Sequence, residues 1–529
     1  GSLRACGKAL GIPDDLISTA SDLLSTRVNA GKTTEDILTE LKDSNPDQDL
    51  PWAHWLEMSS ELKGFPRHLG IHSGGFMIAD RPLDQLVPQE PATMEGRSVI
   101  QWSKDDIEDL GFFKIDILAL GMLTAIRKAL RMITEQYKHP LTLASVPQED
   151  QGTYQMIQRA DTIGTFQIES RAQMSMLPRM RPKTFYDLVI EVAIIRPGPI
   201  QGGMIHPFLR RRHGLEPITY PDERLRPILH RTLGIPIFQE QVMRIAMAIG
   251  SFTPGEANEL RKNMGAWSLR GDINPWLEKL SDGMQKNGIA PEFANAILAQ
   301  MKGFAEYGFP ESHSVSFALI AYVSCYLKKH YPAAFFASLL NSQPMGFYSP
   351  HTLVQTARRQ GIAVLPVCVN HSDWDATLEP LSTGNTQDFA IRLGMRMITG
   401  LSQKSGKHIE KTRQKIGKWT SWEEFLKHTK IPRHDLTALA AANFFQAFGL
   451  SRRSAIWIAA AAPHSSWLED VDLKTRFPEE TKKESLQQDF SGTQTSLYAH
   501  PAEFIRDESW CYDIPKSKLK RSAELEDLI

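Results

Sequence analysis

A lysine and an aspartate stand two residues apart in an apolar stretch, GFFKIDILALGML at 111–123, which reads as a buried strand running into a helix. Side chains alternate between the faces of a strand, so Lys114 and Asp116 share one face. Burying a lone carboxylate is costly, so Asp116 needs a partner. Carboxylates bind hard divalent cations, and two such ions about 3.5–4 Å apart assist phosphoryl transfer. Asp116 is therefore a candidate metal ligand, and the alternative is a structural Lys–Asp pair at a sheet edge.

The stretch FTPGEANELRKNMGAW at 252–267 predicts a helix with a basic face. Thr253 and Glu256 form a capping box, with proline at the first helical position. Arg261 and Lys262 project from a face other than the apolar one, where they could meet a triphosphate. The alternative is an ordinary solvated basic face.

The stretch EYGFPESHSVSFALIAYVSCYLKKHYP at 306–332 predicts an apolar helix that stops before Pro332. Ser312, His313 and Ser314 stand at its start. Free N–H groups and the helix dipole favour an anion there, so these side chains could grip phosphates. Plain N-capping by Ser314 is the alternative.

A third candidate is the loop IIRPGPIQGGM at 194–204, which is followed by the run Arg210–Arg212. Its prolines stiffen the chain and its glycines allow a close approach of the backbone, so the loop could present Arg196 to a ligand. A simple tight turn would explain the same residues.

The stretch ITGLSQKSGKHIEKTR at 398–413 resembles a helix-hairpin-helix, whose backbone N–H groups meet DNA phosphates without reading sequence. A weaker second candidate is FGLSRRSAIW at 448–457, and an ordinary helical hairpin is the alternative for both. The candidate DNA-binding residues are Gly400, Ser402, Lys404, Lys407, Arg452 and Arg453.

Two further patterns are weak. His68 and His72 are four residues apart, as metal ligands on a helix would be, but the glycines around them argue against a helix. The stretch QQDF at 487–490 faintly resembles a sliding-clamp peptide, although it lies in a polar region.

Composition sets outer limits on function. The chain has 529 residues, a hydrophobic share of 42% and a formal net charge of -1, so a nucleic-acid partner must be held by local basic faces. The four cysteines lie far apart, which fits a reducing cytoplasm. No apolar run reaches the roughly 18 residues of a membrane span, so no membrane partner is expected.

These stretches must be positioned by an α+β fold that is predominantly helical. Periodicity predicts helices over 3–65, a small sheet over 66–120, long helices from Met122 to about 345, short strands over 350–395, paired helices over 396–465, and a polar linker beyond Pro463.

Taken together, these stretches resemble the alpha subunit of bacterial C-family replicative DNA polymerases, over nearly the whole chain. Details such as FAEYGFPESHS and MGAW resemble the error-prone, mutasome-type branch; the replicase usually has two basic residues where Ala266 and Trp267 stand. The matching stretches follow the family's order: LRACGKALG, HSGGFMIA, KIDILAL, GTFQIESRAQM, IIRPGPIQGGM, GIPIFQEQVMRIA, LRKNMG and YGFPESHSVSFALIAYVSCYLKKHYPAAF.

The resemblance implies domains and roles. It implies a thumb at 1–68, the C-terminal part of the palm at 69–120, fingers at 121–395, tandem helix-hairpin-helix at 396–465, and a linker at 466–529 toward an oligonucleotide-binding domain. Asp116 matches the third of three palm aspartates that hold two Mg²⁺ ions, and Lys114 matches the lysine beside it. The implied nucleotide-binding residues are Arg196, Gln239, Arg261, Lys262, Tyr307, Ser312 and His313.

The family's first two palm aspartates lie in a Pro-Asp-x-Asp stretch upstream of LRACGKALG, and that stretch is not in this sequence. NPDQD at 45–49 imitates it but comes later, in a loop closed by Pro51. We therefore expect the chain to be the central and C-terminal piece of a longer polymerase, to bind no Mg²⁺ by itself, and to bind DNA without extending it.

The resemblance also implies partners and a reaction. The parent would perform error-prone, translesion-type synthesis by attack of a primer 3′-hydroxyl on a nucleotide's alpha-phosphate. Its expected partners are primer–template DNA, dNTPs, mutasome accessory proteins and, as a further candidate, the sliding clamp. The alternative interpretation is a DNA-binding and partner-docking scaffold with a non-functional polymerase site.

Overall fold

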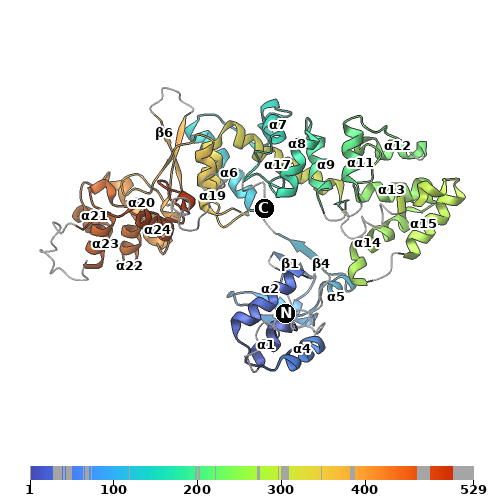
Figure 1. Cartoon of the computed structure of the whole chain (residues 1–529), viewed down its shortest axis with the longest axis horizontal. Helices are drawn as coiled ribbons and strands as arrows, with labels where there is room; N and C mark the ends of the chain where they lie inside the picture. Colours follow the sequence, from blue (N-terminus) through green and yellow to red (C-terminus); the bar gives the residue numbers. More distant parts are fainter. Residues whose placement is uncertain are drawn as a thin grey trace, which may run out of the picture. The chain divides into compact units, whose positions relative to one another are not determined.

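The chain divides into two compact units, Gly1–Ala119 and Leu120–Ile529 (Figure 1). In the part of the chain that the structure describes, no helix is both long and apolar enough to cross a membrane. The computed structural model describes residues 2–27, 39, 42, 50–62, 65, 71–72, 74–117, 120–196, 199–200, 203–220, 222–270, 274–295, 297–298, 309–346, 348–381, 388–461 and 477–503.

The first unit contains a small helical core. Helices α1 (Ser2–Ala9), α2 (Asp14–Arg27) and α4 (Trp52–Glu61) surround Trp55, whose indole N–H donates to the Leu3 carbonyl at 2.8 Å. The indole of Trp55 is fully buried. The predicted helices of this region are confirmed where the structure describes them, and α5 (Lys104–Asp109) follows later in the unit.

The strands of the first unit form two separate ribbons, so the prediction of one small sheet over 66–120 is wrong for the described residues. Strand β1 (Gly75–Ile78) pairs with β4 (Phe113–Asp116), and β2 (Gln89–Pro91) pairs with β3 (Ser98–Ile100), both antiparallel. The register places Phe76 opposite Ile115 and Ile78 opposite Phe113, so one face of the first ribbon is apolar.

Strand β4 is not buried, which corrects the interpretation of 111–123. The side chain of Phe113 is 66% exposed and that of Ile117 is 65% exposed. Among the described residues, β1 is the one strand that pairs with β4, and two strands alone cannot enclose an apolar face.

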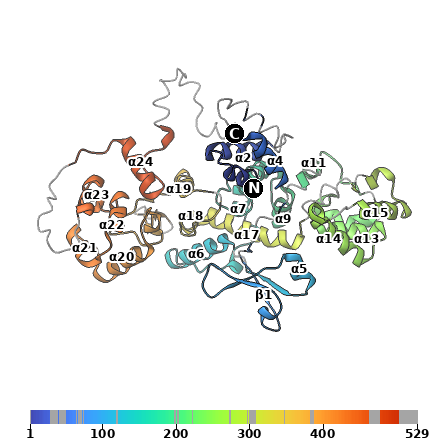
Figure 2. The same ribbon diagram turned by 90° about the horizontal axis from the view of Figure 1, so that it is seen from below.

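Helix α17 (Glu311–His330) lies at the centre of the second unit. It packs against α9 (Phe185–Ile194), α7 (Gln151–Gln158), α6 (Gly121–Gln136) and α18 (Pro332–Leu340), and Figure 2 shows these helices around it. The helical pattern predicted from Met122 is confirmed, because α6 buries that face. Helices α8 (Arg171–Met180), α11 (Ile205–Arg212), α12 (Arg226–Leu229) and α19 (Pro350–Arg359) belong to the same unit.

A second group of helices in this unit is built on α13 (Gln239–Gly250), which contacts α14 (Pro254–Arg270) and α15 (Asn274–Lys286). Helices α13 and α15 cross closely, because a Cβ on Gly283 would lie 2.0 Å from the Gly250 carbonyl oxygen.

The strands predicted over 350–395 form a three-stranded sheet after α19. Strand β7 (Phe389–Arg392) is central, parallel to β5 (Val364–Leu365) and antiparallel to β6 (Thr377–Pro380). The 3-10 helices are Leu83–Gln85, Leu143–Ser145, Glu223–Leu225, His230–Thr232, Met395–Met397 and Gln446–Phe448.

The paired helices predicted over 396–465 are present. They are α20 (Gln403–Ile416), α21 (Trp422–Thr429), α22 (Arg433–Ala441) and α23 (Arg452–Ala461). The aromatic rings of Trp419, Trp422, Phe425 and Phe445 pack edge to face between them. One further helix, α24 (Lys482–Thr493), lies in the stretch interpreted from sequence as a polar linker.

Candidate functional site

Asp116 lies on the ribbon of β1 and β4, directly opposite Gly75. Its Oδ2 is 3.8 Å from Nε2 of His72, and the Asp116 side chain is 59% exposed. Lys114 stands on the same face, opposite Met77. The sequence singled out Asp116 because a buried carboxylate needs a partner. The structure shows this side chain exposed, so that reason does not hold.

A metal ion needs more ligands than this ribbon shows. Within the described residues, no group of three or more histidines, cysteines, aspartates or glutamates is placed to hold a metal. One carboxylate does not make a Mg²⁺ site, because Mg²⁺ demands a nearly octahedral set of oxygens. Tyr307, His68 and the NPDQD stretch lie outside the described residues.

Three of the predicted nucleotide-binding residues meet at the start of α17. The guanidinium Cζ of Arg196 lies 3.6 Å from the centre of the Phe309 ring, and the ring of His313 meets the same phenylalanine edge to face at 4.9 Å. The backbone N–H of Gln239 donates to the Phe309 carbonyl at 3.1 Å. We call Arg196, Gln239, Phe309 and His313 the α17 cluster.

The α17 cluster gathers residues from three elements. Arg196 follows α9, and its Nε donates to the Val192 carbonyl at 3.2 Å, which orients the side chain back along that helix. Gln239 begins α13 and His313 lies in the first turn of α17. The sequence reasoning missed Phe309, although its place between a glycine and a proline just before the helix was a visible signal.

Burial and charge lower the pKa values of two members of the α17 cluster. Burial lowers the pKa of the half-buried Arg196 guanidinium. Burial, and then the positive charge of Arg196, lower the pKa of His313. A neutral imidazole beside a guanidinium is thus favoured at neutral pH. Together they offer an anion one fixed charge and one additional N–H donor.

The start of α17 already holds a carboxylate. The N–H of Glu311 donates to Oε2 of Glu240, from α13, at 2.9 Å. Ser314 is not the N-cap, so that alternative is wrong. Its Oγ donates to the Val189 carbonyl at 2.5 Å, and the N-cap is Pro310 without a side-chain bond. Ser312 lies exposed in the same turn.

The capping box of α14 is confirmed. The Thr253 N–H donates to the Glu256 carboxylate at 2.9 Å, and the Glu256 N–H donates to the Thr253 hydroxyl at 3.3 Å. A hydrogen bond from Lys279, then those from Thr253, lower the pKa of Glu256 to about 2.

The two cations predicted on α14 have local partners. Arg261 donates from Nε and Nη2 to the Asn258 side chain at 3.1 Å, and Lys262 pairs with Glu259 at 3.0 Å. Both partners stand on α14 itself, three residues before the cation that they hold. Arg261 and Lys262 therefore form a second group, on a helix that packs against α13.

The arginine run after the 194–204 loop is paired. Arg210 and Arg211 both bind Glu216, and Arg212 binds Asp187 at 2.5 Å. These arginines consequently serve local structure, whereas Arg196 faces the ring of Phe309.

The first hairpin candidate has the predicted turn. Gly400 has a φ of +81°, a conformation that favours glycine, and Ser402 caps α20. The Ser402 N–H and hydroxyl donate to the buried carboxylate of Asp435 at 2.8 and 2.9 Å. Burial would raise the pKa of Asp435, but hydrogen bonds from Ser405 and Ser402 outweigh it and hold that pKa below its usual value. Lys404 and Lys407 are exposed on α20.

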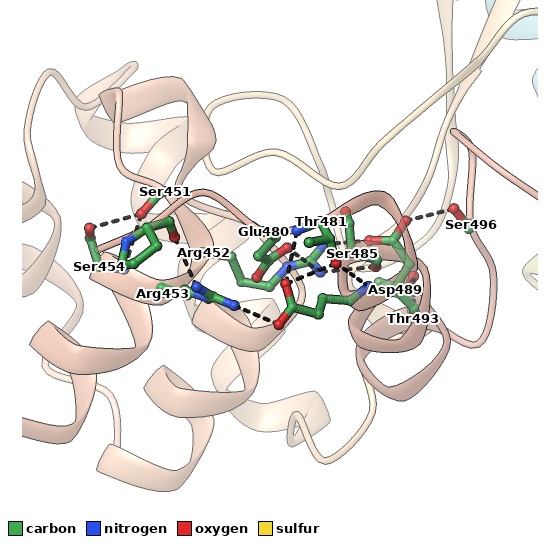
Figure 3. A network of polar contacts seen from close by, with 12 residues as sticks. Ser451, Arg452, Arg453, Ser454, Glu480, Thr481, Ser485, Asp489, Thr493 and Ser496 are labelled. Carbon is green, nitrogen blue, oxygen red and sulfur yellow. Dashed lines mark hydrogen bonds and ion pairs between the residues drawn. The ribbon is translucent and has the colours of Figure 1, made fainter. Parts of the chain in front are cut away.

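The second hairpin candidate differs from the prediction. Arg452 is buried, and its guanidinium bonds to Asp489 and, at 3.2 Å, to Glu480 (Figure 3). Arg453 pairs with Glu484 at 3.0 Å. Arg452 therefore has no path to a phosphate in this structure, and its role is to hold α24 against the hairpin region.

The QQDF stretch is folded into α24. Asp489 is the buried partner of Arg452, and the ring of Phe490 lies 4.9 Å from that of His351. Asp489 is buried, so a clamp could reach its side chain only if α24 left its place.

Three parts of the chain match models of known protein families. Residues 1–119 match the bacterial DNA polymerase III alpha NTPase domain, residues 122–288 match the finger domain of the same subunit, and residues 361–455 match a helix-hairpin-helix motif.

Curated relatives match along 96% of the chain. Proteins named error-prone DNA polymerase are 47% identical in Methylococcus capsulatus, 47% in Allorhizobium ampelinum and 46% in Pseudomonas fluorescens Pf0-1. The match covers 50%, 47% and 49% of those proteins, so the chain spans about half their length.

Proposed function

Because the chain belongs to the bacterial DNA polymerase III alpha subunit family, we propose that it is the thumb, fingers, partial palm and hairpin region of an error-prone, translesion-type DNA polymerase. The observation that carries this proposal is the α17 cluster. Its fixed cation and its imidazole lie at a helix start, the arrangement that suits a phosphate chain.

The proposed reaction is attack of a primer 3′-hydroxyl on the alpha-phosphate of a dNTP, with pyrophosphate leaving. Arg196 would neutralise charge on the phosphates, and His313 would donate a hydrogen bond. Gln239 would hold the backbone of Phe309 and so fix the ring beneath Arg196. Ser312, Arg261, Lys262 and Tyr307 would complete the nucleotide contacts.

Asp116 is proposed as one Mg²⁺ ligand of the complete polymerase, with Lys114 beside it. The ribbon of β1 and β4 has one carboxylate, that of Asp116, which is not enough to hold two ions. No step of the reaction is therefore assigned to metal in this chain, and the chain alone is proposed to bind primer–template DNA without extending it.

The test is primer extension with Mg²⁺, run with this chain, with a longer polymerase that restores the upstream palm, and with Asp116→Asn in that longer protein. Extension by the longer protein alone, abolished by the substitution, is the expected result. Extension by the chain alone would contradict the proposed inactivity. A longer folded protein that binds DNA and never extends it would favour the scaffold interpretation.

We also propose that the protein works in a reducing cytoplasm with mutasome accessory proteins. Cys6, Cys325 and Cys368 are free thiols, which agrees with a reducing compartment. Docking of the accessory proteins and of the sliding clamp is likewise proposed, and no surface of the chain is assigned to either.

A further inference from the structure

Positive charge is concentrated in one region of a chain that is nearly neutral. Residues 400–433 contain seven lysines and two arginines against three glutamates, while the whole chain has a formal charge of -1. A local basic face of this kind is what holds a polyanion on an otherwise neutral protein.

Helix α20 carries the centre of this charge on one face. Lys404, Lys407, Lys411 and Lys415 are spaced by three or four residues, so they share a face, and all four are exposed. The opposite face is fixed in the fold, because Ile409 is buried and a Cβ on Gly406 would lie 2.3 Å from the Trp374 ring.

The other charged groups of α20 are already engaged. Arg413 pairs with Asp373, and the Glu410 carboxylate accepts the Trp374 N–H at 2.9 Å. Arg413 and Glu410 thus have partners outside α20. We call the four exposed lysines of α20 the lysine row. Like charges four residues apart destabilise a helix, so this row has a cost that an external anion would remove.

The hairpin turn is a poorer phosphate site than the sequence suggested. Asp435 takes both the N–H and the hydroxyl of Ser402, and it also takes the hydroxyl of Ser405 at 2.5 Å. A buried negative charge thus stands behind the start of α20. Arg452 of the second hairpin is paired with Asp489. The exposed lysine row is better placed than either group to meet a ligand.

We propose that the lysine row of α20, rather than the hairpin turn alone, tracks the phosphate backbone of duplex primer–template DNA. This rests on the proposed function and adds Lys411 and Lys415 to the DNA path. The row is about 16 Å long from the rise of an α-helix, which is long enough to meet several successive phosphates of one strand. Such contacts read no sequence.

The test measures how DNA binding by the full chain depends on salt, with a labelled primer–template duplex and a labelled single strand. The distal pair, Lys411→Gln/Lys415→Gln, changes the two lysines farthest from the hairpin turn, and Lys404→Gln changes the lysine next to the turn. The control pair, Lys138→Gln/Lys286→Gln, removes two exposed lysines outside residues 400–433. Thermal unfolding of each variant verifies that it folds.

On duplex, the Lys411→Gln/Lys415→Gln variant should lower the slope of log binding constant against log salt by about 1.8, or about 0.9 for each phosphate that a lysine no longer neutralises. Lys404→Gln should lower it by about 0.9, and the control pair should leave it unchanged. A slope changed by Lys404→Gln but not by the distal pair would overturn the lysine row and keep the hairpin turn.

Two other results also contradict the proposal. An effect of the distal pair confined to the single strand would exclude the duplex as the partner. If the unsubstituted chain bound neither DNA, both the lysine row and the DNA binding included in the proposed function would be overturned, whereas retained binding with an unchanged slope in the distal pair would overturn the lysine row alone.

Discussion

At the residue scale, the α17 cluster depends on a guanidinium stacked on a phenylalanine ring. Arg196→Gln in the complete polymerase removes the fixed charge and should weaken dNTP use by roughly 1–3 kcal/mol, the range for a charge-assisted contact. DNA binding should stay the same. Single-nucleotide incorporation and DNA titration measure the two separately.

Two companion variants sharpen this prediction. Arg196→Lys keeps the charge but loses the planar stack over Phe309, so an intermediate effect is expected. Arg210→Gln removes an exposed arginine that pairs with Glu216 and should change nothing. Equal losses of nucleotide use and DNA binding in Arg196→Gln would contradict the role given to Arg196.

Glu191 is a second residue with a measurable consequence. Both of its carboxylate oxygens are buried without a hydrogen-bond partner, and burial raises its pKa to about 8, with Arg212 opposing the rise. Between about pH 4.5 and about pH 8 the folded state holds a proton that the unfolded state has lost. The free energy of unfolding should therefore fall as pH rises, by up to about 1.4 kcal/mol per pH unit.

Comparing Glu191→Gln with the parent isolates the contribution of Glu191 to the pH dependence of the free energy of unfolding. Denaturant unfolding at several pH values should show a shallower decline for Glu191→Gln than for the parent, since the amide does not titrate. Glu278→Gln, which alters an exposed glutamate of α15, should leave the decline unchanged. A pH dependence that is the same in Glu191→Gln and in the parent would show that Glu191 is ionised when folded.

At the element scale, α24 is held by a buried ion pair. Removing a single partner leaves a buried charge, so Arg452→Met should lower the free energy of unfolding by about 3–5 kcal/mol. The double variant Arg452→Met/Asp489→Leu should be milder, because the Asp489 charge is removed with that of Arg452 and only Glu480, whose side chain is 16% exposed, loses its partner. Denaturant unfolding checks both, and a double variant as unstable as the single one would refute the pairing.

Elements differ in how far sequence could reveal them. The capping box at Thr253 and Glu256 was predictable because its two bonds span three residues. Arg452 was interpreted as a surface residue because its partners, Glu480 and Asp489, lie 28 and 37 residues away. Ser314 was interpreted as a cap because its acceptor, Val189, is 125 residues away. Local bonding can be predicted from neighbouring residues, whereas pairing between distant helices cannot.

At the scale of the whole molecule, the predominantly helical class followed from periodicity and from the resemblance. The resemblance to the error-prone branch is confirmed by relatives of that name. The two ribbons and the exposure of β4 did not follow, since an apolar strand reads as buried whether or not a neighbour covers it.

The hydrogen bond from the Glu311 N–H to the Glu240 carboxylate affects how tightly the start of α17 would bind an anion. If the proposed triphosphate docks there, it would take a position that the Glu240 carboxylate now holds, so docking would exchange one anion for another. The affinity would then be the difference between two attractions. Release of the ligand would be assisted by the return of Glu240.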